Sequence, residues 1–147
     1  MRSRRGLVPA LLAPASFGLA AVYAARRVPD YSHRDEPMSA LAAKGCAGAP
    51  IMLPGFMAMG ASTWVLARAL DDTAIPRPVP ILMRTTSLGV LFAGLARQSD
   101  QTCPTRFKGS ENVTLSDDLH VFFSIFAFMP WMAMPLITAA FGTRMTP

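Results

Sequence analysis

The sequence predicts an all-α integral membrane protein, a single transmembrane domain over residues 1–147 with about four membrane-spanning helices. Charged residues make up 16% of the chain, against about 25% in soluble domains, so too few are present to cover a globule in water. Four apolar stretches each approach the roughly 20 residues that cross a bilayer core. The 13 prolines are also compatible with membrane helices, because neighbouring groups in a membrane bundle form hydrogen bonds with the carbonyls that proline leaves free.

The first predicted helix, residues 6–25, lies between two groups of arginines: Arg2, Arg4 and Arg5 before it, Arg26 and Arg27 after it. A cleaved signal peptide is the alternative, because a basic segment precedes an apolar core and a passable cleavage site, Val22-Tyr23-Ala24. The apolar core is longer than in most signal peptides, and two arginines follow it at once. A retained helix is therefore the better interpretation.

The other predicted helices cover residues 50–70, 79–96 and 119–141. Arg68 lies near enough to the end of the second to reach the headgroups. The third is the weakest, because it is short and carries Arg84, which must extend towards the nearer membrane surface. The fourth is the most apolar and holds five phenylalanines.

Helix contacts are expected from two sets of residues. Small side chains recur every four residues in the first helix and allow a close approach, and flexible methionines fill the bundle. The small-residue ladder is Leu12, Ser16, Ala20 and Ala24, and the methionines are Met52, Met57, Met59, Met129, Met132 and Met134.

The orientation follows only weakly from charge. With four crossings, the 14 lysines and arginines divide equally between the two sides. The three arginines before the first helix favour cytoplasmic termini in the cell membrane. The polar loops 26–49 and 97–118 then lie together outside, and they hold both histidines and both cysteines. These basic residues flank apolar runs singly or in pairs, which excludes a nucleic-acid surface.

The first of these loops is expected to contain a short interfacial helix. Asp35 is its predicted N-cap, Lys44 lies in its last turn, and Gly45 is placed for a left-handed C-cap. Met38 and Leu41 fall on one face, so this helix either lies flat on the membrane or dips into the bundle.

The segment Tyr31-Ser32-His33-Arg34-Asp35-Glu36-Pro37-Met38-Ser39-Ala40-Leu41 resembles the signature after the first helix in the domain-of-unknown-function 998 family. Cys103-Pro104, Thr114 and His120 are similar to that family's later loop and helix. The resemblance implies a multi-pass membrane protein of bacteria or archaea with no established activity. Members usually have about six helices, so this chain resembles a shortened one.

The start of the last helix carries a second group of polar residues. Thr114 and Asp117 have the spacing of a capping box. Ser116, His120 and Ser124 share one helix face, with Asp117 one turn from His120. A histidine at this depth needs a hydrogen-bond partner, since an unpaired polar group costs several kcal/mol in a membrane.

Two interpretations of these residues stay open. In one, His120, Asp117, His33 and Asp35 form a metal or acid–base site, with Ser32, Ser39 or Ser116 as nucleophile. In the other they are structural: Asp117 and Asp118 complement the helix dipole, and His120 bonds to a neighbouring helix. The candidate ligand-binding residues are Tyr31, Ser32, His33, Asp35, Ser39 and His120, and the weak metal candidates are His33, His120 and Asp117.

The expected function is non-enzymatic: an outer polar cap contacts a lipid, a small molecule or a partner chain. The partner chain is either another membrane protein or a second copy in a homo-oligomer. The alternative is an intramembrane hydrolase with His120, Asp117, His33 and Ser39 as its candidate catalytic residues. Cys46 and Cys103 fall in different outer loops and either form a disulfide or remain separate thiols. The sequence indicates no particular cofactor.

Overall fold

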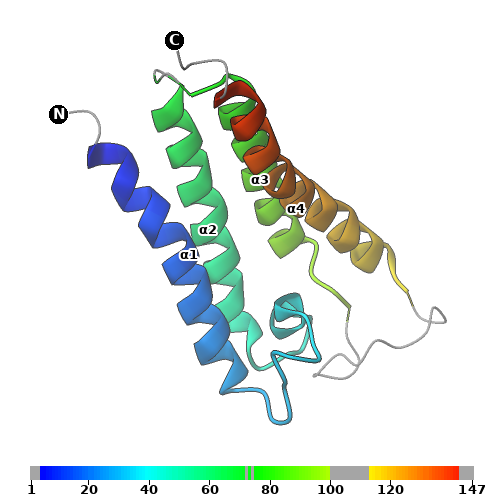
Figure 1. Cartoon of the computed structure of the whole chain (residues 1–147). Coiled ribbons are helices and arrows are strands. Elements are labelled where there is room, and N and C mark those ends of the chain that lie inside the picture. Colours follow the sequence, from blue (N-terminus) through cyan, green and yellow to red (C-terminus); the bar gives the residue numbers. More distant parts are fainter. Residues whose placement is uncertain (1–3, 72, 74, 100–112, 143–147) are drawn as a thin grey trace.

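The computed structural model describes residues 4–71, 73, 75–99 and 113–142, and every regular element within these residues is a helix (Figure 1). The elements are α1 (Arg4–Ala25), the short 3-10 helix η1 (Met38–Ala42), α2 (Ala49–Leu70), α3 (Pro78–Leu95) and α4 (Leu115–Gly142). The predicted all-α class is confirmed.

Three helices have the length and apolar character that a membrane crossing needs. They are Ala49–Leu70, Pro78–Leu95 and the part of α4 from Leu115 to Ala140. The apolar part found in α1 is shorter, Pro14–Ala25. The chain is therefore a membrane helical bundle with three helices of full spanning length and a fourth with a shorter apolar part. Prolines lie inside α2 and α4 without ending them.

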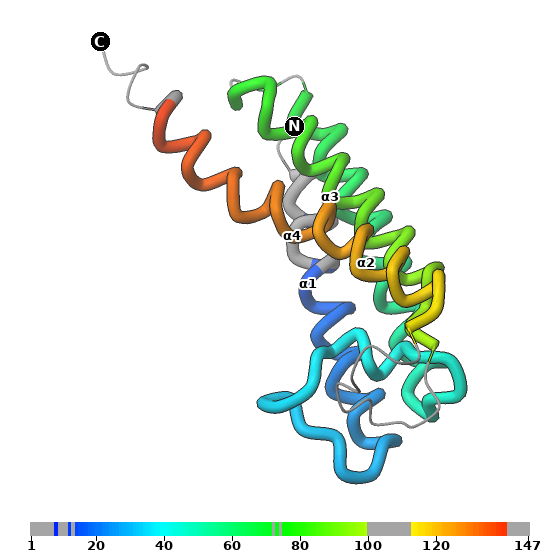
Figure 2. The backbone as a smooth tube through the Cα atoms, turned by 90° about the vertical axis from the view of Figure 1, so that its right-hand side faces the viewer, coloured from blue at the N-terminus to red at the C-terminus, as the bar shows by residue number. Residues whose placement is uncertain are grey.

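The four long helices contact one another in chain order, α1 on α2, α2 on α3, and α3 on α4. The first turn of α1 and the last turn of α4 lie at the same end of the bundle (Figure 1). In Figure 2 the C-terminal half of α4 diverges from α3, although Met134 and Ile137 still pack against a cluster of α2 and α3 residues. In the middle and C-terminal half of α4, Phe128, Trp131 and Leu136 are more than half exposed. Much of the α4 surface is therefore available to lipid.

Small residues set the distances between neighbouring helices. A Cβ on Gly55 of α2 would lie 2.6 Å from the Cβ of Ala20 in α1. Between α2 and α3, the Ser87 hydroxyl donates to the carbonyl oxygen of Gly60 at 2.6 Å. Of the predicted ladder in α1, Ala20 and Ala24 do pack inward, but Leu12 is 56% exposed and its prediction is wrong.

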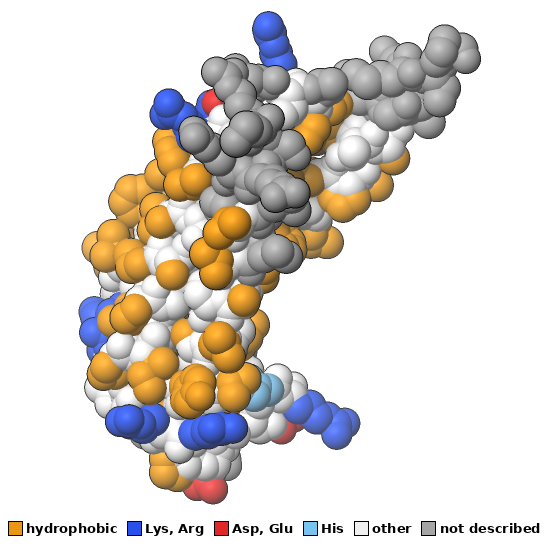
Figure 3. Space-filling model, turned by 90° about the vertical axis from the view of Figure 1, so that its left-hand side faces the viewer, with side chains coloured by type: hydrophobic (Ala, Val, Ile, Leu, Met, Phe, Trp, Pro, Cys, Tyr) orange, Lys and Arg blue, Asp and Glu red, His pale blue; other side chains and the backbone are white. Residues whose placement is uncertain are grey.

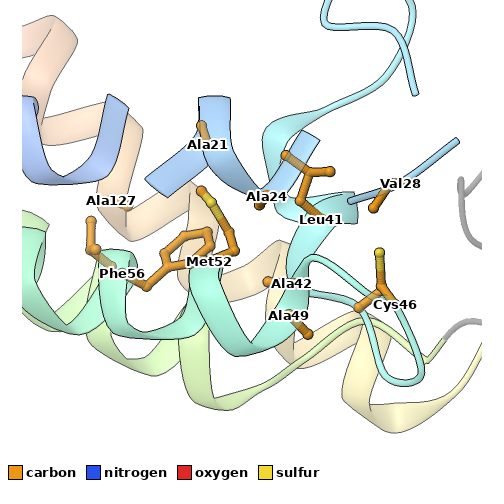
Figure 4. Close-up of a cluster of buried hydrophobic side chains, with 12 residues drawn as sticks. Ala21, Ala24, Val28, Leu41, Ala42, Cys46, Ala49, Met52, Phe56 and Ala127 are labelled. Atoms are coloured by element: carbon orange, nitrogen blue, oxygen red, sulfur yellow. The ribbon is translucent and has the colours of Figure 1, made fainter. Parts of the chain in front are cut away.

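The main core lies where α1 and α2 meet η1 (Figure 4). Leu41 of η1 is fully buried and packs in one cluster with Ala24 of α1 and Met52 and Phe56 of α2. Burial of a side chain of this size contributes about 1.5–3 kcal/mol. Because Leu41 is buried while Met38 is 44% exposed, η1 dips into the bundle rather than lying flat.

The methionines divide between core and surface. Met52 is buried, and Met57, Met59 and Met134 pack partly buried against the clusters. Met129 and Met132 are 61% and 72% exposed, so their predicted place in the core is wrong. Lipid chains are as apolar as a core, and an apolar side chain on a membrane helix can therefore face either one.

Arg84 lies inside α3 near the end opposite η1. Its guanidinium pairs with the Asp71 carboxylate, which follows α2. The guanidinium carbon also lies 5.9 Å from the centre of the Trp64 ring. The arginine thus extends towards the nearer end of the bundle, and a carboxylate and an aromatic ring hold it there.

Candidate functional site at the polar end

The polar end of the bundle comprises residues 26–48, residues 96–99 and the first two turns of α4. The first two segments meet directly, because the backbone N–H of Lys44 donates to the carbonyl oxygen of Gln98 at 2.9 Å. Three of the four candidate catalytic residues, His33, Ser39 and Asp117, are at least partly exposed here, and His120 is buried.

His120 closes the end of α3. Its Nδ1 lies 2.8 Å from the carbonyl oxygen of Ala93 and 2.9 Å from that of Ala96. Carbonyl oxygens only accept, so Nδ1 carries the proton. The last carbonyls of a helix have no partner within the helix, and His120, 4% exposed, supplies one from α4.

Asp117 organises the turn before α4. Its carboxylate accepts from the backbone N–H of Thr114 at 2.9 Å and from the Thr114 hydroxyl at 2.7 Å. It also accepts from the backbone N–H of Ser99 at 2.8 Å and from the Ser99 hydroxyl. The bond from the Thr114 N–H to the Asp117 carboxylate is one of the two bonds of the predicted capping box. The helix α4 begins at Leu115, four residues before the predicted start.

Arg97 joins η1 to the rest of the polar end. Its Nε and Nη2 donate to the carbonyl oxygens of Ala42 and Ala43, both at 2.9 Å. The Ser116 hydroxyl donates to the carbonyl oxygen of Arg97. Sequence reasoning missed this role, because Arg97 directly follows an apolar helix and was counted only as a basic flank.

The tip of the first loop, residues 30–36, is mostly exposed. The predicted N-cap role of Asp35 is wrong: Pro37 precedes η1 with no side-chain cap, and Asp35 accepts from the Ser32 hydroxyl at 2.8 Å. The His33 ring packs edge-on against Tyr31 at 4.9 Å. Burial, with the nearby Glu36 carboxylate, raises the pKa of Tyr31 above its usual value of 10.0.

The residues after η1 follow the prediction in one respect. Gly45 has φ +85°, the left-handed conformation expected of it, which residues with a Cβ adopt at a cost. The helix itself ends earlier, at Ala42, so Lys44 lies in the following turn rather than in the last turn of the helix.

Two buried acceptor oxygens at the polar end have no hydrogen-bond partner among the described residues. They are Oε2 of Glu36 and Oε1 of Gln98. Buried polar atoms nearly always have a partner, so each of these calls for one from beyond the described residues: another part of the chain, water, a cation or a ligand. The sequence did not indicate either residue, because a buried acceptor without a partner arises only when the chain folds.

The candidate catalytic residues are not joined to one another. His120 bonds to α3 carbonyls, Asp117 to Ser99 and Thr114, and His33 contacts Tyr31. Within the described residues, no group of three or more His, Cys, Asp or Glu side chains is placed to hold a metal ion. Cys46 is 4% exposed, and Cys103 lies outside the described residues, so their pairing stays a prediction.

The fold and the hydrogen-bonded polar end define a helical membrane protein without an assembled catalytic centre in the described residues. The chain belongs to the family described as protein of unknown function (DUF998), which matches residues 11–146. This confirms the resemblance seen in the loop after the first helix. Comparison with curated proteins and with solved structures found no significant match.

Proposed function

We propose that this multi-pass membrane protein is non-enzymatic and that its polar end binds a ligand carrying hydrogen-bond donors, such as the ammonium group of a lipid headgroup or of a small amine. The observation that carries the proposal is Oε2 of Glu36, which is buried and has no hydrogen-bond partner among the residues that the structure describes. An acceptor left unpaired in this way costs about 1–3 kcal/mol, and more for a charged group. A donor from the ligand removes that cost.

The preceding loop tip suits such a ligand. Arg97 holds the loop at Ala42 and Ala43, so ligand binding need not order it. Tyr31, Ser32 and His33 lie just before Glu36; the phenol and the hydroxyl are partly exposed, and the imidazole is exposed. A partner chain or a second copy that offers a lysine or a backbone N–H would meet the same requirement.

The hydrolase alternative has less support. A nucleophilic serine needs a base within hydrogen-bond reach. The hydrogen bonds of His120 go to backbone carbonyl oxygens, and the Ser116 hydroxyl donates to Arg97 instead. Ser39 lies in η1, with no bond to either histidine among the described residues.

The test compares two phospholipids that differ in their donors. The ammonium of phosphatidylethanolamine has N–H groups, whereas the trimethylammonium of phosphatidylcholine has none. We expect short-chain phosphatidylethanolamine to raise the unfolding temperature of the purified protein more than phosphatidylcholine does. Glu36→Gln should abolish the difference, whereas Asp30→Asn, a change at an exposed acidic residue of the same loop, should keep it.

Free ethanolamine separates the two sources of the ammonium group. If it stabilises the protein as well as the lipid does, the ligand is a small amine rather than a headgroup. Equal effects of both phospholipids on the unchanged protein, with none from ethanolamine, would show the proposal to be wrong.

We also propose that Cys46 and Cys103 form a disulfide and that the polar end lies outside the cell membrane, with both termini cytoplasmic. The chain has 2 cysteines, so alkylation of the unfolded protein gives a direct count. We expect no alkylated cysteine before reduction and two after it, measured by intact mass. Two alkylated cysteines without reduction would contradict the disulfide.

A further inference from the structure

The C-terminal part of α1 has an exposed apolar face that is followed by two arginines. Leu19, Val22 and Tyr23 are 60%, 46% and 55% exposed, and Arg26 and Arg27 follow them, also exposed. Figure 3 views the molecule from this side: hydrophobic side chains cover the face, and Lys or Arg side chains lie near its lower edge. The arginines therefore lie where lipid chains give way to headgroups.

Tyr23 and Arg26 are placed together at this boundary. The Arg26 guanidinium carbon lies 5.4 Å from the centre of the Tyr23 ring, within the range of a cation–π contact. Arg27 follows Arg26 directly in the turn after α1 and is exposed as well. Tyrosines concentrate at the membrane surface because the ring is apolar and the hydroxyl is not.

The two positive charges have no carboxylate partner in the described part of the chain. The salt bridge found there joins Arg84 to Asp71, at the opposite end of the bundle. Asp30 is the nearest acidic residue in the sequence, and it forms no ion pair with Arg26 or Arg27. Within the described residues, an anion from the surroundings can therefore bind without displacing an ion pair.

We propose that Arg26, Arg27 and Tyr23 bind the phosphate of an anionic phospholipid. Guanidinium groups match phosphate oxygens with paired hydrogen bonds, and the phenol adds a further donor. A headgroup with net negative charge is favoured over a zwitterionic one, because the ammonium of the latter would approach two uncompensated positive charges. The site is separate from Glu36 and does not depend on the proposed ligand there.

The test measures lipid preference at this site alone. A reporter variant carries Leu19→Trp, and Trp64→Phe and Trp131→Phe remove the native tryptophans. It is reconstituted in phosphatidylcholine vesicles that contain either brominated phosphatidylglycerol or brominated phosphatidylcholine. Quenching of the fluorescence of the introduced tryptophan gives the relative affinity of the two lipids. We expect phosphatidylglycerol to be preferred by up to about fivefold per arginine, the size of one basic residue's attraction to an anionic membrane.

Arg26→Gln with Arg27→Gln should bring the preference to about one, whereas Arg34→Gln, at an exposed arginine in the following loop, should leave it unchanged. No preference in the parent, or the same preference without Arg26 and Arg27, would overturn the proposal. The proposal would also be overturned if the preference for phosphatidylglycerol disappeared in sodium phosphate but not in sodium chloride of equal ionic strength. The site would then bind free phosphate rather than a lipid. Spin-labelled phosphatidylglycerol bound to the protein with native tryptophans repeats the comparison if the reporter variant fails to fold.

Discussion

At the scale of single residues, His120 shows what a polar side chain does inside an apolar helix. It satisfies two carbonyl oxygens, of Ala93 and Ala96, at the end of α3. Without this donor, the two carbonyl oxygens would lose the hydrogen bond that His120 gives them. The residue therefore links the end of one helix to the start of the next.

His120→Ala should lower the free energy of unfolding by about 1–3 kcal/mol, because buried acceptors lose their donor. Thermal or denaturant unfolding in detergent, followed by circular dichroism, measures the change. His120→Asn should recover part of the loss, since the amide NH₂ can also donate. His33→Ala, at an exposed ring, should stay within about 0.5 kcal/mol of the unchanged protein. Equal stability of His120→Ala and the parent would rule out this role.

Part of this site could be predicted from the sequence. The need of His120 for a partner and the spacing of Thr114 and Asp117 follow from local rules, and both hold in the structure. The predicted N-cap role of Asp35 is wrong because η1 begins only at Met38, with Pro37 at its N-cap position, and the Asp35 carboxylate accepts from Ser32. The role of Arg97 could not be assigned, since its partners Ala42 and Ala43 lie far from it in the sequence. The burial of Glu36 Oε2 could not be assigned either, because it arises only in the folded chain.

At the scale of elements, η1 is held between the core and Arg97. Leu41 is buried below it, and the guanidinium bonds to the two carbonyls at its end. One side chain thus couples the loop after α1 to the end of α3.

Arg97→Lys should loosen η1 while keeping the charge, because an ammonium lacks the planar pair of donors that reaches both carbonyls. We expect faster hydrogen exchange at the backbone amides of residues 40–46, measured by mass spectrometry. Exchange in α2 should change less, since that helix retains its contacts with α1 and α3. Unchanged exchange in residues 40–46 would contradict a restraining role for the guanidinium.

The contact of α3 with α4 depends on Gly89. A Cβ there would lie 2.5 Å from the backbone nitrogen of Ala127 and 2.8 Å from the carbonyl carbon of Phe126. Backbone cannot move aside as a side chain does, so Gly89→Ala should destabilise the bundle by about 1–3 kcal/mol. Gly18→Ala is the matched control, because a Cβ there meets nothing within 4 Å. It should be neutral or stabilise by up to about 1 kcal/mol. Unfolding in detergent compares the two, and equal effects would argue against close packing at Gly89.

The long helices were predictable because the bilayer thickness fixes the length of an apolar segment. Which face of each helix packs inward was less predictable. Ala20 and Ala24 turned inward as their size suggests, but Leu12, Met129 and Met132 face outward. Hydropathy cannot separate these cases, because lipid and protein interior are both apolar.

At the scale of the whole molecule, the orientation in the membrane decides which ligands the polar end can meet. Basic residues lie at both ends: Arg26, Arg27 and Arg34 at the polar end, and Arg68 and Arg77 at the other. The 14 lysines and arginines of the whole chain divide equally between the two sides, so the position of the three arginines before the first helix is the main determinant. That rule predicts cytoplasmic termini, with the polar end facing outward.

Two introduced cysteines test this orientation more directly than the native ones, because Cys46 is only 4% exposed. Arg34→Cys lies in the exposed loop of the polar end, and Arg77→Cys lies between α2 and α3, also exposed. With a membrane-impermeant maleimide on intact cells, we expect labelling at position 34 and none at position 77 until the cells are lysed, located by peptide mass spectrometry. The reverse pattern would place Glu36 and both histidines in the cytoplasm. The reducing environment there would also disfavour a disulfide between Cys46 and Cys103, so the two proposals for the polar end can be checked against each other.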